Sequence, residues 1–206
     1  MPNGVEYSLT FANDSCNGAD VCIYQEDPDL SNSRVMSLAW FTKFAWPTTR
    51  IKFTWTLDYS FVWDRTGTLE AGVVFNASQD WGANLSTTNQ VTLTYDENAF
   101  TFRNQTAGGR QGSLYITEDG TIPLQVGSVG IGMSGAGTFV SQAQPNWELV
   151  FTPHPTYWIT FGNYTQGQVL DTLSISNAAE IQFPDNVYDM NAILNRNNTW
   201  TIEQAA

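Results

Sequence analysis

The chain has 206 residues, and its 20 acidic and 8 basic side chains give a net charge of −12. A surface of this charge repels phosphate backbones and anionic lipid headgroups, so we expect no nucleic acid partner. No apolar run approaches the roughly 18 residues of a membrane helix, and a chain of this length can bury a core without help from a metal. We therefore expect neither a membrane span nor a cofactor.

The N-terminal residues and the cysteines indicate a compartment. Residues 1–7 carry neither the basic stretch nor the apolar stretch of an export signal. We therefore expect a cytoplasmic protein in which Cys16 and Cys22 remain reduced thiols.

The first part of the chain shows the periodicity of strands. Residues 5–11 alternate apolar and polar side chains, and the turn-forming residues 13–18 lead into a second apolar segment, residues 21–25. This pattern predicts a β-hairpin. Residues 35–44 follow as an apolar segment that fits either a strand or a partly buried loop.

The strongest periodic signal lies in residues 51–63, where seven successive odd positions carry large apolar or aromatic side chains. A period of two places these side chains on one face of a sheet, which no helix could do. Fully extended, the segment would span on the order of 40 Å, which is longer than most strands. We therefore predict a bend or bulge near Asp58 or Ser60, in a strand that forms a wall for the others.

Short strand candidates separated by turn residues continue to the end of the chain. Their spacing predicts an all-β fold, an antiparallel β-sandwich of jelly-roll type that forms a single domain over residues 1–206. The segment of residues 187–194 fits either a strand or a short helical turn. The other predicted strands are residues 68–76, 90–95, 99–104, 112–117, 128–133, 138–142, 147–152, 157–161, 180–183 and 198–203.

A glycine-rich segment contains the pattern G-x-G-x-x-G at Gly130, Gly132 and Gly135. A phosphate-binding loop requires a strand before the glycines and a helix after them, but residues 138–140 have the composition of a strand. We therefore interpret the glycines as a backbone that aromatic rings approach closely, or as a sharply bent strand.

His154 is the single histidine, and Pro153 and Pro155 flank it. One histidine excludes a zinc site built from several histidines, and no serine lies in a nucleophile motif. The prolines could hold the imidazole at a loop tip for a ligand contact, although the pattern favours a structural or solvated histidine. Among the carboxylates, Asp58 and Glu148 are predicted to face solvent.

Aromatic residues make up 14% of the chain, which is enough to supply both a core and a binding surface. Flat rings with a polar edge can stack on sugars or enclose an apolar ligand. Most rings must belong to the core, but the turn residues that follow Trp46 and Trp81 make these two the best candidates for exposure. The predicted ligand-binding residues are Trp46, Trp81, Trp147, His154, Tyr157 and Trp158.

Three segments carry a resemblance to a known family: residues 35–41 (VMSLAWF), 53–63 (FTWTLDYSFVW) and 158–164 (WITFGNY). In these segments the chain resembles the bacterial RhiA-type proteins, named after a rhizosphere-expressed protein, and the resemblance extends over nearly the whole length. It implies a bacterial protein whose expression accompanies life near plant roots. It implies no activity that could be assigned to particular residues.

These observations lead to a primary hypothesis and two alternatives. We predict a non-enzymatic binding protein that recognises a glycan or a small apolar molecule through loop aromatics and His154. The first alternative is a hydrolase or isomerase that uses His154 or a pair of carboxylates. The second is a structural protein that self-assembles into homo-oligomers through exposed sheet edges.

Overall fold

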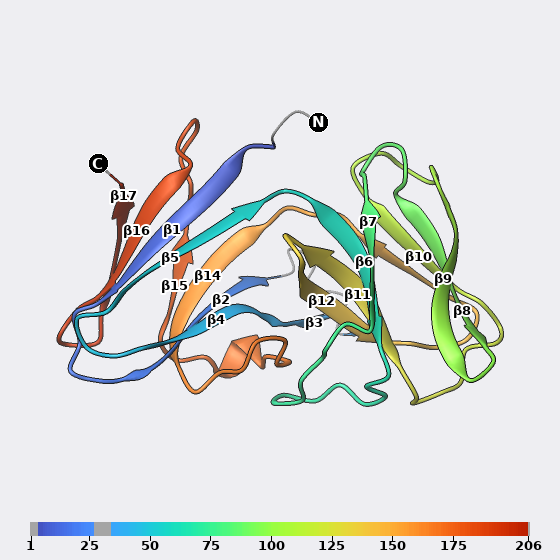
Figure 1. The fold of residues 1–206 in the computed structure, drawn as a ribbon, viewed down its shortest axis with the longest axis horizontal. Helices are drawn as coiled ribbons and strands as arrows, with labels where there is room; N and C mark the ends of the chain where they lie inside the picture. The colour runs from blue at the N-terminus through green and yellow to red at the C-terminus, as the bar shows by residue number, and fades with distance from the viewer. Residues whose placement is uncertain (1–3, 27–33, 206) are drawn as a thin grey trace.

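The computed structural model describes residues 4–26 and 34–205, and its regular structure is almost entirely β-strand (Figure 1). Its one helical element is a 3₁₀ turn, η1 (Thr172–Ser174). No helix in the described residues has the length and hydropathy needed to cross a membrane. The strands are β1 (Glu6–Asn13), β2 (Ala19–Glu26), β3 (Met36–Ser37), β4 (Ala39–Ala45), β5 (Arg50–Thr56), β6 (Tyr59–Asp64), β7 (Gln79–Ala83), β8 (Gln90–Asp96), β9 (Ala99–Thr106), β10 (Leu114–Glu118), β11 (Ser128–Met133), β12 (Ala136–Gln142), β13 (Trp147–Phe151), β14 (Thr156–Gly162), β15 (Ala178–Ile181), β16 (Asp189–Leu194) and β17 (Trp200–Gln204).

The strands form four sheets that pair into two sandwiches. The first sandwich packs sheet β17-β16-β1-β5 against sheet β15-β14-β2-β4, and the second packs sheet β3-β12-β11-β6-β7 against sheet β13-β10-β8-β9. In Figure 1 the blue and red strands from the two ends of the chain lie together in the first sandwich, and the green strands lie in the second. All strand pairs are antiparallel except β1–β16 and β8–β10. The predicted all-β sandwich fold is confirmed.

The long alternating segment of residues 51–63 links the two sandwiches as β5 and β6. Its odd positions divide between two cores, because Phe53 and Trp55 pack in the first and Phe61 and Trp63 in the second. The predicted bend is confirmed, since the strands are interrupted at residues 57–58. The segment is therefore a bridge that serves both cores.

The turn between β11 and β12 holds this bend in place. The Ser134 hydroxyl accepts a hydrogen bond from the Thr56 main-chain N–H at 3.3 Å, and the Ser134 N–H donates to the Asp58 carbonyl oxygen at 3.0 Å. Asp58 itself is exposed, as predicted.

Within the continuously described residues 34–205, the chain passes between the sandwiches at two further points. Leu38 separates β3 from β4, and residues 152–155 separate β13 from β14. Leu38 is fully buried and joins a third apolar cluster that includes Val62 and Val140. Because Val62 lies between Phe61 and Trp63 in β6, this cluster covers the opposite face of that sheet from the second core.

Residues 68–76 do not form the predicted strand. Gly72 has a φ of +93°, and Val74 makes one isolated bridge to Gln168. Phe75 packs into the third cluster, so the apolar side chains of this irregular loop cover a sheet face without extending the sheet. The next strand in the chain is β7, which the periodicity did not predict.

The predicted hairpin between residues 5–11 and 21–25 is wrong. β1 pairs with β5 and β16, whereas β2 pairs with β4 and β14, so the connection crosses from one sheet to the facing sheet. The buried Asn13 amide supports the crossing by donating to the carbonyl oxygens of Asn17 at 2.8 Å and Ala45 at 3.1 Å. The turn residues are those of an inter-sheet connection.

The glycine-rich segment is strand β11 with its flanks, as the structural interpretation predicted. A Cβ atom on Gly130 would lie 1.9 Å from the Phe139 carbonyl oxygen, and one on Gly127 would lie 2.5 Å from the Phe100 ring. The register with β12 shifts between Ile131 and Gly132. The close approach of an aromatic ring is confirmed at Gly127, the register shift marks an irregularity in the strand, and no helix follows the glycines.

Candidate functional site

A cleft of about 440 Å³ opens at one end of the first sandwich, beside two of the places where the chain crosses to the second. The cleft is lined by aromatic and aliphatic side chains together with a few polar residues, which is the composition expected of a small-molecule site. Its lining residues are Tyr7, Leu57, Pro155, Thr156, Tyr157, Glu180, Ile181, Gln182 and Phe183.

Three elements bring the rings of the cleft together. Tyr7 near the start of β1 and Tyr157 near the start of β14 belong to facing sheets, and both contact the first core. The pairing of β14 with β15 places Ile181 opposite Tyr157. Phe183 lies two residues beyond Ile181, so it reaches the same end of the sandwich. Leu57 completes the wall from the bend between β5 and β6.

Phe183 is the centre of the aromatic arrangement. Its ring is nearly perpendicular to that of Tyr7, at 5.1 Å and 87°, and to that of Tyr157, at 5.8 Å and 79°. Trp55 lies behind them, with its ring centroid 5.7 Å from that of Phe183 at an interplanar angle of 90°. Edge-to-face contacts of this kind are favoured by the ring quadrupoles and fix each ring against its neighbours.

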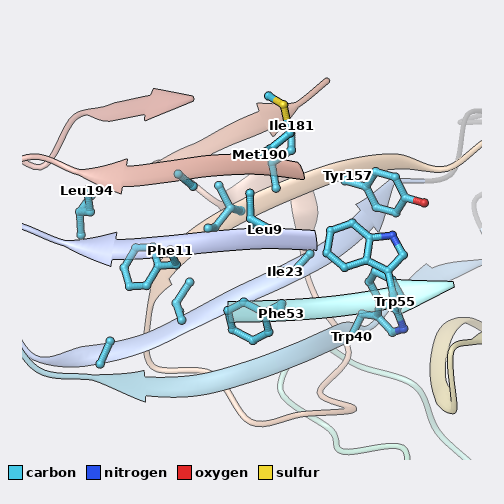
Figure 2. Packing of buried hydrophobic residues seen from close by; sticks show 14 of the residues in the cluster. Leu9, Phe11, Ile23, Trp40, Phe53, Trp55, Tyr157, Ile181, Met190 and Leu194 are labelled. Carbon is cyan, nitrogen blue, oxygen red and sulfur yellow. The ribbon is translucent and has the colours of Figure 1, made fainter. Parts of the chain in front are cut away.

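Two polar atoms are buried behind the rings of the cleft. The Tyr157 hydroxyl and the Trp55 Nε1 have no hydrogen-bond partner of standard geometry among the described residues, and their side chains are 5% and 1% exposed. Burial raises the pKa of Tyr157 above its ordinary value, and the neighbouring Trp55 indole offsets part of this increase. Figure 2 shows both side chains at the end of the core opposite Leu194. Such unmatched groups are rare in protein interiors, so each one calls for an explanation.

Glu180 is the one charged residue among the described residues that line the cleft. Glu180 is exposed and forms no salt bridge with a described residue. None of the eight basic side chains is among the described residues that line the cleft. Glu180 is paired with Trp158 and therefore lies on the outer face of the sheet, opposite to the face that carries Tyr157 and Ile181.

Of the predicted ligand-binding residues, Tyr157 lies in the cleft and His154 lies beside it. His154 is exposed in the connection between β13 and β14, one residue before the cleft residue Pro155. Its Nδ1 is 3.2 Å from the Thr152 carbonyl oxygen. Trp158 follows Tyr157 in β14 and therefore points to the opposite face, where it stacks on Tyr24 at 6.4 Å and 18°.

The other three predicted residues lie elsewhere on the molecule. Trp46 follows β4 and is 68% exposed. Trp81 is half-buried in β7, with its ring 5.9 Å from that of Phe102. Trp147 begins β13, and the Arg34 guanidinium lies 4.5 Å from its ring centroid. The structure therefore does not bring the six residues into one site.

The described residues offer little for metal or thiol chemistry. They contain no group of three or more His, Cys, Asp or Glu side chains placed to hold a metal ion. Cys16 and Cys22 form no disulfide, and burial raises the pKa of the Cys22 thiol, so this group stays protonated at neutral pH.

Glu118 is a buried carboxylate that the sequence reasoning missed. It is 1% exposed, its Oε1 accepts from the Gln144 N–H at 3.1 Å, and its Oε2 has no partner among the described residues. Burial raises its pKa to about 7. The burial of Glu118 could have been predicted from the sequence, because Leu114, Ile116 and Glu118 alternate in β10 and share its inward face.

Comparison with known proteins identifies the family of this sequence. A sequence model of the RhiA family matches residues 4–205. The chain belongs to the RhiA family. Protein RhiA of Rhizobium leguminosarum bv. viciae is 39% identical over 211 residues, an alignment that covers 100% of this chain and 89% of that protein. The resemblance expected from the sequence is confirmed.

No solved structure matches this RhiA-family fold. The name RhiA states neither a ligand nor a reaction. A function for this RhiA-family protein must therefore be inferred from the residues of its own cleft.

Proposed function

We propose that this RhiA-family protein binds a small molecule with an apolar body in the cleft of Tyr7, Leu57, Tyr157, Glu180 and Phe183. The observation that carries the proposal is the meeting of three aromatic side chains in a cleft of about 440 Å³. That volume lies within the usual range for small-molecule sites, which is roughly 300–1,000 Å³.

A fragment screen by ligand-observed NMR tests the proposal with two matched variants. Leu57 lines the cleft and is 44% exposed, whereas Leu173 is 92% exposed in η1 and does not line it. We expect Leu57→Trp to fill the mouth of the cleft and abolish the signals of bound fragments. Leu173→Trp should leave these signals unchanged. Fragments that bind Leu57→Trp as well as the wild type, or a screen without any hits, would overturn the proposal.

A second candidate is glycan binding by the surface of Phe44 and Trp46. These side chains are 50% and 68% exposed, and their rings meet edge to face at 4.9 Å and 64°. The Trp46 indole packs closely against Gly18, where a Cβ atom would lie 2.7 Å from Trp46 Cε3. An exposed and fixed indole can stack on the apolar face of a sugar ring.

A glycan array distinguishes this candidate from the cleft. Trp46→Ala should abolish any glycan signal, while Trp147→Ala, a change at another exposed tryptophan, should preserve it. A signal that survives Trp46→Ala would rule out this surface.

A further inference from the structure

We propose that a second cleft, between the two sandwiches, binds a small neutral molecule rich in hydroxyl groups, such as a monosaccharide. This inter-sandwich cleft has a volume of about 370 Å³, and its lining includes Trp40, Asn76, Asp80, Ala136, Gln166 and Gly167. It shares no lining residue with the cleft of Tyr7 and Phe183, so this inference goes beyond the proposed function and does not depend on it.

The inter-sandwich cleft takes its walls from both sandwiches. Trp40 in β4 and Gly167 in the connection from β14 to β15 come from the first sandwich, and Asp80 in β7 comes from the second. The Gly167 N–H donates to the Ala39 carbonyl oxygen at 2.8 Å, and the Gly167 carbonyl oxygen accepts from the Phe75 N–H at 2.9 Å. These bonds fix the walls against each other. Small-molecule sites occur preferentially where two such structural units meet.

The Asp80 carboxylate lies at the wall of this cleft. Asp80 is paired with Val62, and residues directly opposite each other in a strand pair share a sheet face. Val62 packs with Phe75 in the third apolar cluster, so the Asp80 side chain is on the face that carries Phe75. The Ser60 hydroxyl shares this face and donates to Asp80 Oδ2 at 2.9 Å. The carboxylate is therefore held outside the second core, where a ligand can reach it.

The glycine-rich segment provides space for this arrangement. A Cβ atom on Gly132 would lie 2.9 Å from Ser60 Oγ, so the glycine leaves room for the hydroxyl that holds Asp80. Residues 135–137 line the cleft with no side chain larger than a methyl group. Small residues of this kind let a ligand approach the main chain closely. Part of the G-x-G-x-x-G pattern therefore serves the cleft.

The composition of the lining favours a neutral ligand with many hydroxyl groups. Asp80 is the one charged residue among the described residues of this lining, so an anion would be repelled. An apolar molecule would cover the carboxylate without replacing its hydrogen bonds to water, which costs free energy. The exposed residues Asn76 and Gln166 add carboxamide groups, which both donate and accept hydrogen bonds. A hydroxyl group also does both, whereas an ammonium group only donates, so a polyol matches this lining better than an amine.

Saturation-transfer NMR with neutral monosaccharides tests the inference. The probes are glucose, galactose, mannose, xylose and arabinose, with cyclohexanol and cyclohexylamine as rings of similar size that lack the set of hydroxyl groups. We expect at least one monosaccharide to give a saturation-transfer signal with the wild-type protein. Neither cyclohexyl probe should compete with it.

Two pairs of variants assign the signal to the inter-sandwich cleft. Ala77→Trp fills the cleft and should abolish the monosaccharide signal, whereas Ala71→Trp, at an exposed position of the same β6–β7 connection but outside the cleft, should preserve it. Asp80→Asn keeps the shape of the side chain and should weaken binding about tenfold, because a carboxylate accepts stronger hydrogen bonds than an amide does. Asp185→Asn, at an exposed aspartate that does not line the cleft, should have no effect. Circular dichroism verifies that each variant is folded.

The inference would be overturned if no monosaccharide bound or if the signal survived Ala77→Trp. If Ala77→Trp did not fold, unchanged affinity in Asp80→Asn would overturn it. A signal lost in Trp46→Ala but kept in both variants would assign the sugar to the surface of Phe44 and Trp46, which would also contradict the inference. Leu57→Trp should preserve the monosaccharide signal, so the inference and the proposed function can fail separately.

Discussion

The indole N–H of Trp40 donates to the main-chain oxygen of Met133 at 2.8 Å, and this bond joins β4 of the first sandwich to the last residue of β11 in the second. Trp40 is fully buried, and its ring stacks on that of Tyr157 at 6.0 Å and 18°. One side chain therefore connects the second sandwich to the base of the cleft.

Replacing this indole should destabilise the protein much more than the same change at the surface. Trp40→Phe removes the donor from a buried carbonyl and leaves a small cavity, so we expect the free energy of unfolding to fall by about 2–4 kcal/mol. Trp46→Phe makes the same substitution at a side chain that is 68% exposed and should change stability by at most about 0.5 kcal/mol. Urea denaturation of both variants provides the measurement, and equal effects would contradict the assigned role of Trp40.

Glu118 should make the stability of the protein depend on pH. Burial raises its folded-state pKa from 4.5 to about 7, so the folded protein binds the proton more tightly than the unfolded chain does. The resulting stabilisation is fully present below pH 4.5 and is lost as the pH rises through about 7. Its upper limit is about 3.5 kcal/mol, because one pKa unit corresponds to roughly 1.4 kcal/mol.

Glu118→Gln tests this linkage because it keeps the shape of the side chain and removes the titration. We expect the decline in stability between pH 5 and pH 7.5 to become shallower in the variant, as measured by urea denaturation at several pH values. Glu148→Gln, at an exposed position, should retain the wild-type pH dependence. The same slope in wild type and Glu118→Gln would show that another group is responsible.

The Tyr157 hydroxyl should contribute nothing to the stability of the ligand-free protein. It is buried and has no hydrogen-bond partner of standard geometry among the described residues, so Tyr157→Phe removes a desolvated group without breaking a bond. We expect the free energy of unfolding to stay constant or to rise by about 1 kcal/mol. Tyr157→Leu removes the ring contacts as well and should cost about 1–3 kcal/mol. Thermal unfolding that ranks Tyr157→Phe below Tyr157→Leu would refute this assignment.

Gly130 should tolerate no side chain. An alanine there would place its Cβ 1.9 Å from the Phe139 carbonyl oxygen and 2.7 Å from the Val140 Cα, both of which belong to the backbone of β12. We expect Gly130→Ala to lower the stability by more than about 3 kcal/mol or to abolish soluble expression. Gly82→Ala is the matched control, because its Cβ would meet no atom within 4 Å, and it should express normally. Similar soluble yields of the two variants would disprove the close approach.

The periodicity of residues 51–63 predicted the strand and its bend but not its two cores. Apolar residues alternate with period two whether they pack into one core or into two. The pattern therefore could not show that Trp55 packs in the first core and Phe61 in the second. The loop of residues 68–76 was wrongly predicted to be a strand for a related reason. Its apolar side chains are buried, as alternation suggests, but they cover a sheet face from outside.

The candidate site was predictable only where local sequence determined it. Tyr157 was identified because it lies beside the proline-flanked His154, and the exposure of Trp46 followed from the turn after it. Tyr7 and Phe183 meet through sheet pairing between distant parts of the chain, which no local pattern reports. Trp81 has the same kind of turn signal as Trp46, yet β7 places it against Phe102.

The order of the strands along the chain has a consequence for biosynthesis. β1, β2, β4 and β5 leave the ribosome early, but their partners β14 and β16 follow only after nearly all of the second sandwich has been made. The second sandwich can therefore form first, while the two sheets of the first sandwich are still incomplete and have unpaired edges. Non-local pairing of this kind slows folding and exposes apolar strands in the meantime. We expect the nascent first sandwich to be the part of this protein that most needs a chaperone.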